Sequence, residues 1–179
     1  MILSLLSPVK IRFFILFALL AGISACVKGP SYPLEPHIEF KSVSSASLFS
    51  GYVDTITVSF TDGDGDIGVY ASSSDSCDPC SFKRGDTSCL FMHSYNVFMI
   101  DSRDTCVSYF ASANISSDSK FKGISGDIDI IRAIDSKKCL SVPDPNCPLD
   151  TVVYTIVIRD LANHFSNKVK TTPIVVDGR

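Results

Sequence analysis

Three aspartates alternate with glycines in the run 62–66, directly after a stretch of β-branched residues. Carboxylates at Asp62, Asp64 and Asp66, on a backbone that glycine allows to turn tightly, can surround a hard cation such as Ca²⁺. The run is not an EF-hand loop, because Ile67 stands where that loop needs glycine and no helical pattern flanks the run. An ordinary solvated turn is the alternative, since Asp and Gly favour turns for backbone reasons alone. The sequence leaves both interpretations open.

The first 25 residues have the features of an export signal. Lys10 and Arg12 are positively charged, the run 13–20 is entirely apolar, and small residues follow it. The apolar run is shorter than the roughly 20 residues that a membrane-spanning helix needs. The junction at its end, Ile-Ser-Ala before Cys26, resembles the lipobox of bacterial lipoproteins. An ordinary secretory signal with a chance cysteine is the alternative.

The lipobox resemblance implies cleavage before Cys26 and fatty acyl chains on the new N-terminus, which would anchor the protein to a membrane. We therefore divide the chain into a cleaved signal peptide (1–25), a Pro-rich tether (26–36) and one folded domain (37–179). The expected location is the cell envelope, at the outer membrane, and the sequence does not choose between its two faces. The mature chain carries 14 basic and 19 acidic residues, a net charge of −5. This charge disfavours nucleic acid as a partner.

Cysteine usage fits an exported domain. Apart from Cys26, the six cysteines are Cys77, Cys80, Cys89, Cys106, Cys139 and Cys147. An even number in an exported domain is typical of disulfides, although spacing does not fix the pairing. Our best single prediction is a Cys139–Cys147 bond across a Pro-containing loop. The Cys77-x-x-Cys80 spacing also occurs in redox and zinc sites, but here no helical pattern follows to lower a thiol pKa, so we interpret it as structural.

After residue 36 the apolar residues repeat with a period of two, which predicts β-strands. Strands are predicted around residues 38–40, 55–60, 95–100, 127–130, 152–159 and 168–176, the last interrupted by Pro173. No run of ten or more residues after position 36 has helical periodicity. The pattern predicts an all-β domain, an antiparallel sandwich. The polar segments 71–90 and 137–150 are predicted to be long loops stapled by disulfides.

Four stretches resemble small Bacteroidetes lipoproteins with an immunoglobulin-like domain: 36–40, 60–68, 123–128 and 154–167. The resemblance implies an immunoglobulin-like sandwich and a lipoprotein address, but no activity. The cysteine-rich segment 71–90 departs from it. Asp150-Thr151-Val152 also resembles the acceptor pattern for O-linked glycans in exported proteins of this group, and a chance tripeptide is the alternative at Thr151.

The implied strand order adds a fourth acidic residue to the candidate site. If 55–60 is the second strand and 152–159 the sixth, both strands end at the same pole of an immunoglobulin-like sandwich. That arrangement would bring Asp160, and with it Asn163, close to the aspartates of 62–66. Repulsion among the carboxylates would be relieved by a divalent cation. Asp62, Asp64, Asp66 and Asp160 are therefore the candidate calcium ligands.

The sequence offers little for catalysis. It lacks a Gly-x-Ser-x-Gly motif and a phosphate-binding glycine loop, and its three histidines have no metal-ligand spacing. We therefore expect a non-catalytic binding module whose partner is an envelope protein or a glycan. The aromatic residues available for a glycan are Phe91, Tyr95, Tyr109 and Phe110. The alternatives are a structural accessory subunit of an outer-membrane assembly and, less in keeping with the sequence, a small hydrolase.

Overall fold

The computed structural model describes residues 29–48, 51–69, 78, 84–92, 94–116, 122–133, 146 and 148–176. The strands are β1 (His37–Leu48), β2 (Gly51–Asp62), β3 (Asp66–Ile67), β4 (Val97–Asp101), β5 (Val107–Phe110), β6 (Ile115–Ser116), β7 (Ile124–Ala133), β8 (Asp150–Val152), β9 (Tyr154–Ile158), β10 (Val169–Lys170) and β11 (Ile174–Val176). A 3₁₀ turn lies at Ser88–Phe91. The predicted signal peptide and Cys26 lie outside the described residues.

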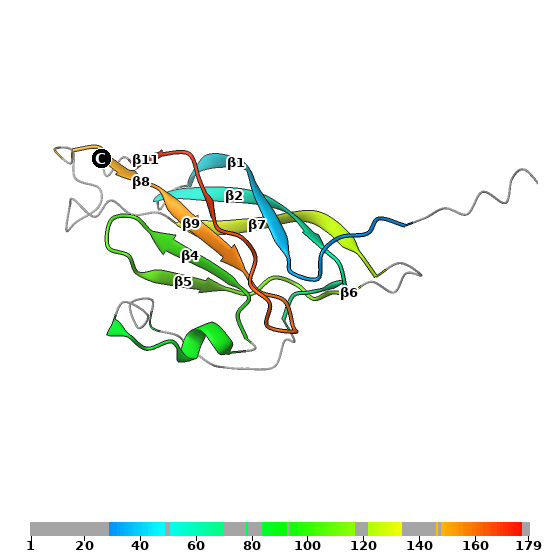
Figure 1. Cartoon of the computed structure of the whole chain (residues 1–179). Coiled ribbons are helices and arrows are strands. Elements are labelled where there is room, and N and C mark those ends of the chain that lie inside the picture. Colours follow the sequence, from blue (N-terminus) through cyan, green and yellow to red (C-terminus); the bar gives the residue numbers. More distant parts are fainter. Residues whose placement is uncertain are drawn as a thin grey trace, which may run out of the picture.

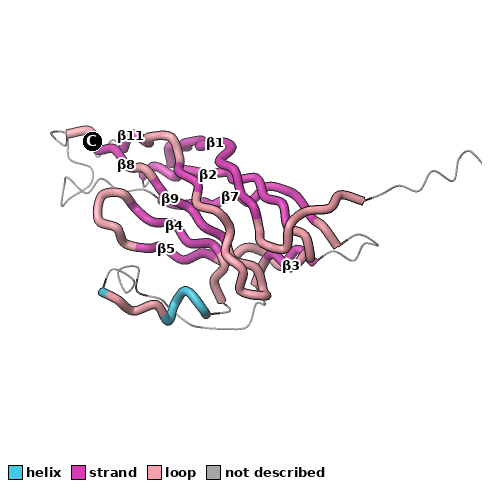
Figure 2. The backbone as a smooth tube through the Cα atoms, in the orientation of Figure 1, coloured by secondary structure: helices cyan, strands magenta, loops and turns pink. Residues whose placement is uncertain are grey.

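The strands form two main antiparallel sheets (Figure 1). One has the order β1-β2-β7 and the other β10-β9-β4-β5. Two small ribbons, β8 with β11 and β3 with β6, complete the pairing among the described strands. The tube in Figure 2 shows that the two main sheets lie as neighbouring layers, with the segment 84–92 beyond β5 on the far side of the second layer.

Alternation along the strands builds the core between these layers. Ile56 and Val58 of β2 pair with Ile130 and Ile128 of β7, so these four side chains share one face of their sheet. The second sheet contributes apolar residues of β4 and β9 to the same buried cluster. The intervening Thr and Ser residues of β2 lie on the opposite face, as the period of a strand requires. The predicted all-β architecture with antiparallel sheets is confirmed.

The C-terminal run shows how a proline divides a strand. The predicted strand 168–176 is two short strands, because Pro173 lacks the N–H that a continuous ladder needs. β10 pairs with β9, and after the break β11 pairs with β8. The short strands β3, β5 and β6 were not predicted. Their two to four residues are too few to show an alternating pattern.

Two of the six cysteines lie in the described residues. Cys89 and Cys106 are buried and disulfide-bonded. The other four, and with them the predicted Cys139–Cys147 bond, lie outside the described residues. Thr151 is exposed in the middle of β8, opposite Val175 of β11. In the described part of the chain, no helix has the length and apolar character needed to cross a membrane.

Candidate metal centre

The acidic loop begins where β2 ends, and backbone amides hold it in a tight turn. The Asp62 carboxylate accepts hydrogen bonds through Oδ2 from the amides of Gly65 (2.8 Å) and Asp66 (3.0 Å). Gly65 has a φ of 74°, in the left-handed region that favours glycine. At Gly63 a Cβ atom would lie 2.4 Å from the carbonyl oxygen of Pro33, so a side chain has no room there. The alternation of Asp with Gly therefore has a backbone cause in this loop.

Asp160 reaches the loop from the other sheet. It follows β9, and an isolated antiparallel bridge pairs it with Ile67 of β3. The amide of Leu161 donates to the Asp66 carbonyl (3.1 Å), and the amide of Ala162 donates to Asp66 Oδ2 (3.0 Å). The predicted approach of Asp160 to the loop is confirmed. Asn163 lies in the turn that follows Asp160: it has a φ of 71° and its amide donates to the Asp160 carbonyl.

The four predicted carboxylates form one cluster. One oxygen from each of Asp62, Asp64, Asp66 and Asp160 lies within 4.8 Å of the others. Asp62 and Asp160 are almost fully buried, with 0 % and 2 % exposure. One oxygen, Oδ1, of each of the three loop aspartates is buried without a hydrogen-bond partner among the described residues. Buried carboxylate oxygens without a partner are costly, and a cation held by the cluster would satisfy them.

The electrostatics of the cluster lead to the same conclusion. Burial, followed by repulsion from the three other carboxylates, raises the pKa of Asp66 to about 6. Burial also raises the pKa of Asp62, although the amides of Asp66 and Gly65 act in the opposite direction. A carboxylate whose pKa is raised by like charges regains its charged form when a divalent cation binds. The metal-free cluster is therefore poised to exchange protons for a metal ion.

His164 is a neighbour that sequence reasoning missed. Its amide donates to Asp160 Oδ1 (2.7 Å), and its ring Nδ1 lies 2.8 Å from Asp160 Oδ2. The bond to the Asp160 side chain raises the pKa of His164. The imidazole thus holds the Asp160 carboxylate in place from outside the cluster, as groups next to metal ligands commonly do. The only sequence signal for this contact was that His164 follows Asp160 by four residues.

The cluster has the chemistry of a calcium site. Calcium takes six to eight oxygen ligands at about 2.3–2.6 Å, so ligands on opposite sides of the ion lie about 5 Å apart. A cluster within 4.8 Å fits inside that span. Four carboxylates supply a sufficient number of charged ligands, and carbonyl groups or water complete such a shell in other proteins. The residues present therefore fit a hard divalent cation.

A second buried acidic cluster lies near the start of β9. Arg103 donates to Asp101 through its Nη2 (2.7 Å) and to Asp150 through its Nη1 (2.9 Å). Both carboxylates are almost fully buried, and the guanidinium is largely buried between them. Burial lowers the pKa of Arg103, but the bonds to the two carboxylates together outweigh it and raise the pKa, so the guanidinium stays charged. Sequence patterns gave no sign of this cluster, because Arg103 and Asp150 are 47 residues apart.

The aromatic residues considered for a glycan lie on two different surfaces. The ring centroids of Tyr95 and Tyr109 are 5.8 Å apart, and Phe91 packs edge-on against Phe165 at 6.2 Å. Phe98 joins the two pairs, with centroid distances of 6.0 Å to both Tyr109 and Phe165. Phe110 is separate from this group and lines a groove beside β7.

Arg159 attaches the segment beyond β5 to the second sheet. Its guanidinium donates to the carbonyls of Leu90, Met92 (2.6 Å) and Tyr95 (2.9 Å). Its Cζ also lies 5.9 Å from the centroid of the Phe98 ring. Arg159, the residue before the candidate ligand Asp160, therefore also contacts the aromatic group around Phe98.

Comparison of the chain with protein-family models, with curated proteins and with solved structures finds no match.

Proposed function

We propose that this protein is a lipid-anchored, non-catalytic binding module of the bacterial cell envelope and that a structural calcium ion stabilises its fold. The observation that carries the calcium part of the proposal is the cluster of four carboxylates with three buried oxygens that have no partner among the described residues. The ion would link the end of β2 to the end of β9, which belong to different sheets. We propose calcium as the cation because a carboxylate-rich site with only oxygen ligands suits a hard ion.

An immunoglobulin-like fold is part of the proposal. In such domains strands A, B and E share one sheet and strands C, F and G the other. The orders β1-β2-β7 and β10-β9-β4 support this assignment, with β5 as an added edge strand. In variable domains of this fold the loops at one end of the sandwich bind the partner, so the assignment agrees with a binding role.

The anchor is proposed from the sequence at Cys26, and the disulfide framework from the six further cysteines. The described chain before β1 supports a domain that starts close behind its tether, since Tyr32 and Pro33 lie against Gly63 of the acidic loop. The anchor is tested by replacing Cys26 with serine. We expect loss of lipid mass from the N-terminus and loss of membrane retention. A Cys26→Ser protein that is still lipid-labelled would overturn the anchor without touching the calcium site.

Calcium binding is tested on the mature protein in detergent after removal of divalent ions with EGTA. We expect heat of binding in calorimetry and a rise in melting temperature when calcium is added. At a hundred times Kd the stabilisation is about 2.7 kcal/mol, or very roughly 5–10 °C for a domain of this size.

Two variants serve as a matched pair in this test. Asp62→Asn removes charge from the cluster, whereas Asp129→Asn removes an exposed charge elsewhere. The first is expected to lose the response to calcium and the second to keep it. Absence of heat and of a melting shift up to about 10 mM calcium, above the range of extracellular sites, would overturn the proposal and leave an ordinary turn.

A further inference from the structure

The strand β7 is an edge with unused hydrogen-bonding capacity. It runs for ten residues, and within the described strands it pairs with β2 alone. In an antiparallel sheet about half of the N–H and C=O groups of an edge strand point away from its one neighbour. The register with β2 continues without interruption from Val53↔Ala133 to Asp62↔Ile124, so no bulge bends β7 away from an incoming strand.

The opposite edge of the same sheet is protected. The pairing of β1 shifts between Phe40 and Ser42, and such a bulge disturbs further pairing. The side chain of Asn167 also covers the edge: its Oδ1 accepts from the Ile38 amide (2.8 Å) and its Nδ2 donates to the Ile38 carbonyl (2.9 Å). Asn167 therefore occupies the place of a neighbouring strand on β1. The structure protects one edge and, in the described residues, leaves the other accessible.

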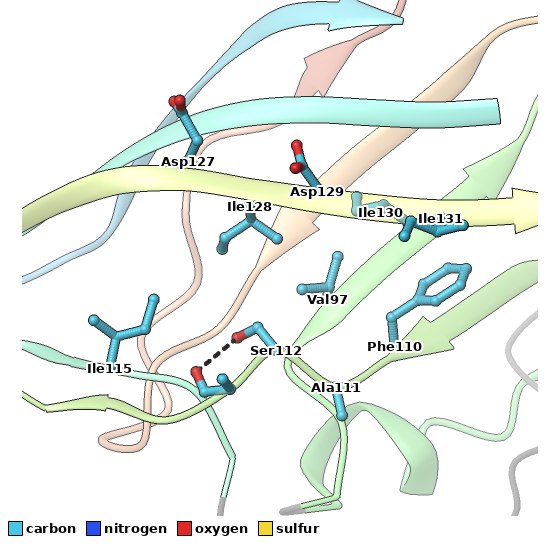
Figure 3. Close-up of a pocket in the computed structure, with 11 residues that line it drawn as sticks. Val97, Phe110, Ala111, Ser112, Ile115, Asp127, Ile128, Asp129, Ile130 and Ile131 are labelled. Atoms are coloured by element: carbon cyan, nitrogen blue, oxygen red, sulfur yellow. Dashed lines mark hydrogen bonds between the residues drawn. The ribbon is translucent and has the colours of Figure 1, made fainter. Parts of the chain in front are cut away.

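A groove of about 410 Å³ lies along the accessible edge (Figure 3). Its floor is apolar, with Ile128 and Ile130 of β7 on one side and Val97, Phe110 and Ile115 on the other. Figure 3 shows Ile128 directed toward this space, whereas Asp127 and Asp129 point to the opposite side of β7. A strand added to β7 would therefore place alternate side chains into the groove and on the outer face.

The outer face beside this edge is acidic. Asp127 forms an exposed ion pair with Lys41 (2.6 Å). Asp129 accepts a hydrogen bond from the Thr57 hydroxyl (2.7 Å), and no ion pair to it is present among the described residues. Ile131, 66 % exposed, continues the same row. Basic residues on an added strand would lie opposite the aspartates, where a cross-strand pair of opposite charge is favourable.

We propose that β7 and its groove bind an extended segment of a partner protein, which joins the sheet as an added strand. This inference rests on the proposed binding role and names the surface and the chemistry of the partner. The segment alternates apolar residues, which fill the groove, with basic residues, which face Asp127 and Asp129. Backbone hydrogen bonds to β7 supply affinity, and the alternation supplies selectivity.

The test uses a synthetic ten-residue peptide that alternates valine with lysine, added to the mature protein in calcium. We expect saturable binding and slower hydrogen exchange of the amides in residues 124–133. The same peptide with alternate backbone nitrogens methylated is expected not to bind, because it cannot complete the ladder. A peptide that alternates valine with glutamate is expected to bind at least about tenfold more weakly.

A charge-reversal variant makes the test specific for this edge. Asp129→Lys is expected to weaken the lysine peptide about tenfold and to strengthen the glutamate peptide. Glu39→Lys reverses an exposed charge on β1 of the same sheet and is expected to leave both affinities within about twofold. Equal effects of the two variants would overturn the proposal, since they would reflect net charge alone.

Two further results would also overturn it: no binding of the lysine peptide, or binding without protection of β7. Protection of β7 in a dimer of the protein alone would assign the edge to a second copy of this chain instead. Calcium-dependent melting is measured on the same samples. If the peptide fails to bind while calcium still stabilises the protein, the edge proposal fails and the calcium proposal stands. If the peptide binds and protects β7 while calcium has no effect on melting, the calcium proposal fails and the edge proposal stands.

Discussion

The two buried acidic clusters of this domain differ in how their charge is balanced. At the end of β9 four carboxylates gather without an arginine or lysine among their described partners. Near the start of β9 Asp101 and Asp150 share the guanidinium of Arg103. Carboxylates that are buried together raise one another's pKa, whereas a cationic side chain buried beside them keeps them charged. The second cluster balances its charge with Arg103, and the first could balance its charge with a metal ion.

The comparison shows what burial of an aspartate can and cannot indicate. Asp62 and Asp101 are equally inaccessible, with 0 % and 2 % exposure. Asp101 receives charge-assisted hydrogen bonds from Arg103, while Asp62 retains a buried oxygen without a described partner. For the three loop aspartates, the unsatisfied atom, and not the burial, distinguishes a candidate metal ligand from a structural carboxylate.

The largest expected effect comes from breaking the balanced cluster. Arg103→Met would leave two buried carboxylates without their cation, which costs about 3–5 kcal/mol of unfolding free energy. Denaturant unfolding measures the loss, and calcium is not expected to restore it. Arg84→Met is the control, because the ion pair of Arg84 with Asp78 is exposed and contributes less than about 1 kcal/mol. A loss of less than about 1 kcal/mol for Arg103→Met would contradict the idea that Arg103 is needed to balance the charges of Asp101 and Asp150.

A smaller effect, with opposite signs in two conditions, is expected at Asp66. Asp66→Asn keeps an oxygen to accept from the Ala162 amide but removes one negative charge from the cluster. In EGTA the variant should be more stable than the wild type, on the order of 1 kcal/mol after allowance for solvent screening. In calcium it should be less stable, because it loses most of the stabilisation that the ion provides. Thermal unfolding in both conditions is the measurement, and a change of the same sign in both would contradict a metal site.

The smallest expected effect is the pH dependence of the metal-free protein. The pKa of Asp66 is about 6 in the folded state against an ordinary value of 3.8, so the folded state binds this proton more tightly than the unfolded chain. Unfolding free energy should therefore rise, on account of this group, as pH falls from 7 toward 4. With calcium bound the trend should reverse, because protons compete with the metal. Melting curves across this range, with and without EGTA, test the sign.

Much of the fold could be predicted because the long strands alternate. In β2 half-buried and buried residues alternate from Val53 to Asp62, and in β7 the buried Ile128 and Ile130 alternate with exposed neighbours. The split at Pro173 was signalled by the proline, but its consequence, pairing of the two halves with different strands, depends on tertiary structure. β5 could not be predicted, since Val107–Phe110 contains adjacent apolar and polar residues in no clear order.

The candidate site was predictable for a different reason. Local sequence gave Asp62, Asp64 and Asp66, and a topological argument then placed Asp160 beside them. The role of His164 was missed because it depends on the turn after Asp160, where the ring folds back on the carboxylate. The cluster around Arg103 was missed because nothing local relates residues of β4 and β8. Sequence spacing reveals ligands that share a loop, and long-range partners need a strand order first.

The absence of a side chain at Gly63 has a consequence for the whole molecule. Because the backbone of Tyr32 and Pro33 lies directly against this residue, the predicted tether touches the acidic loop before the chain enters β1. A calcium ion that stiffens the loop would therefore also fix the joint between domain and tether. With the proposed lipid anchor in place, the orientation of β7 relative to the membrane would then vary with the calcium content of the surroundings.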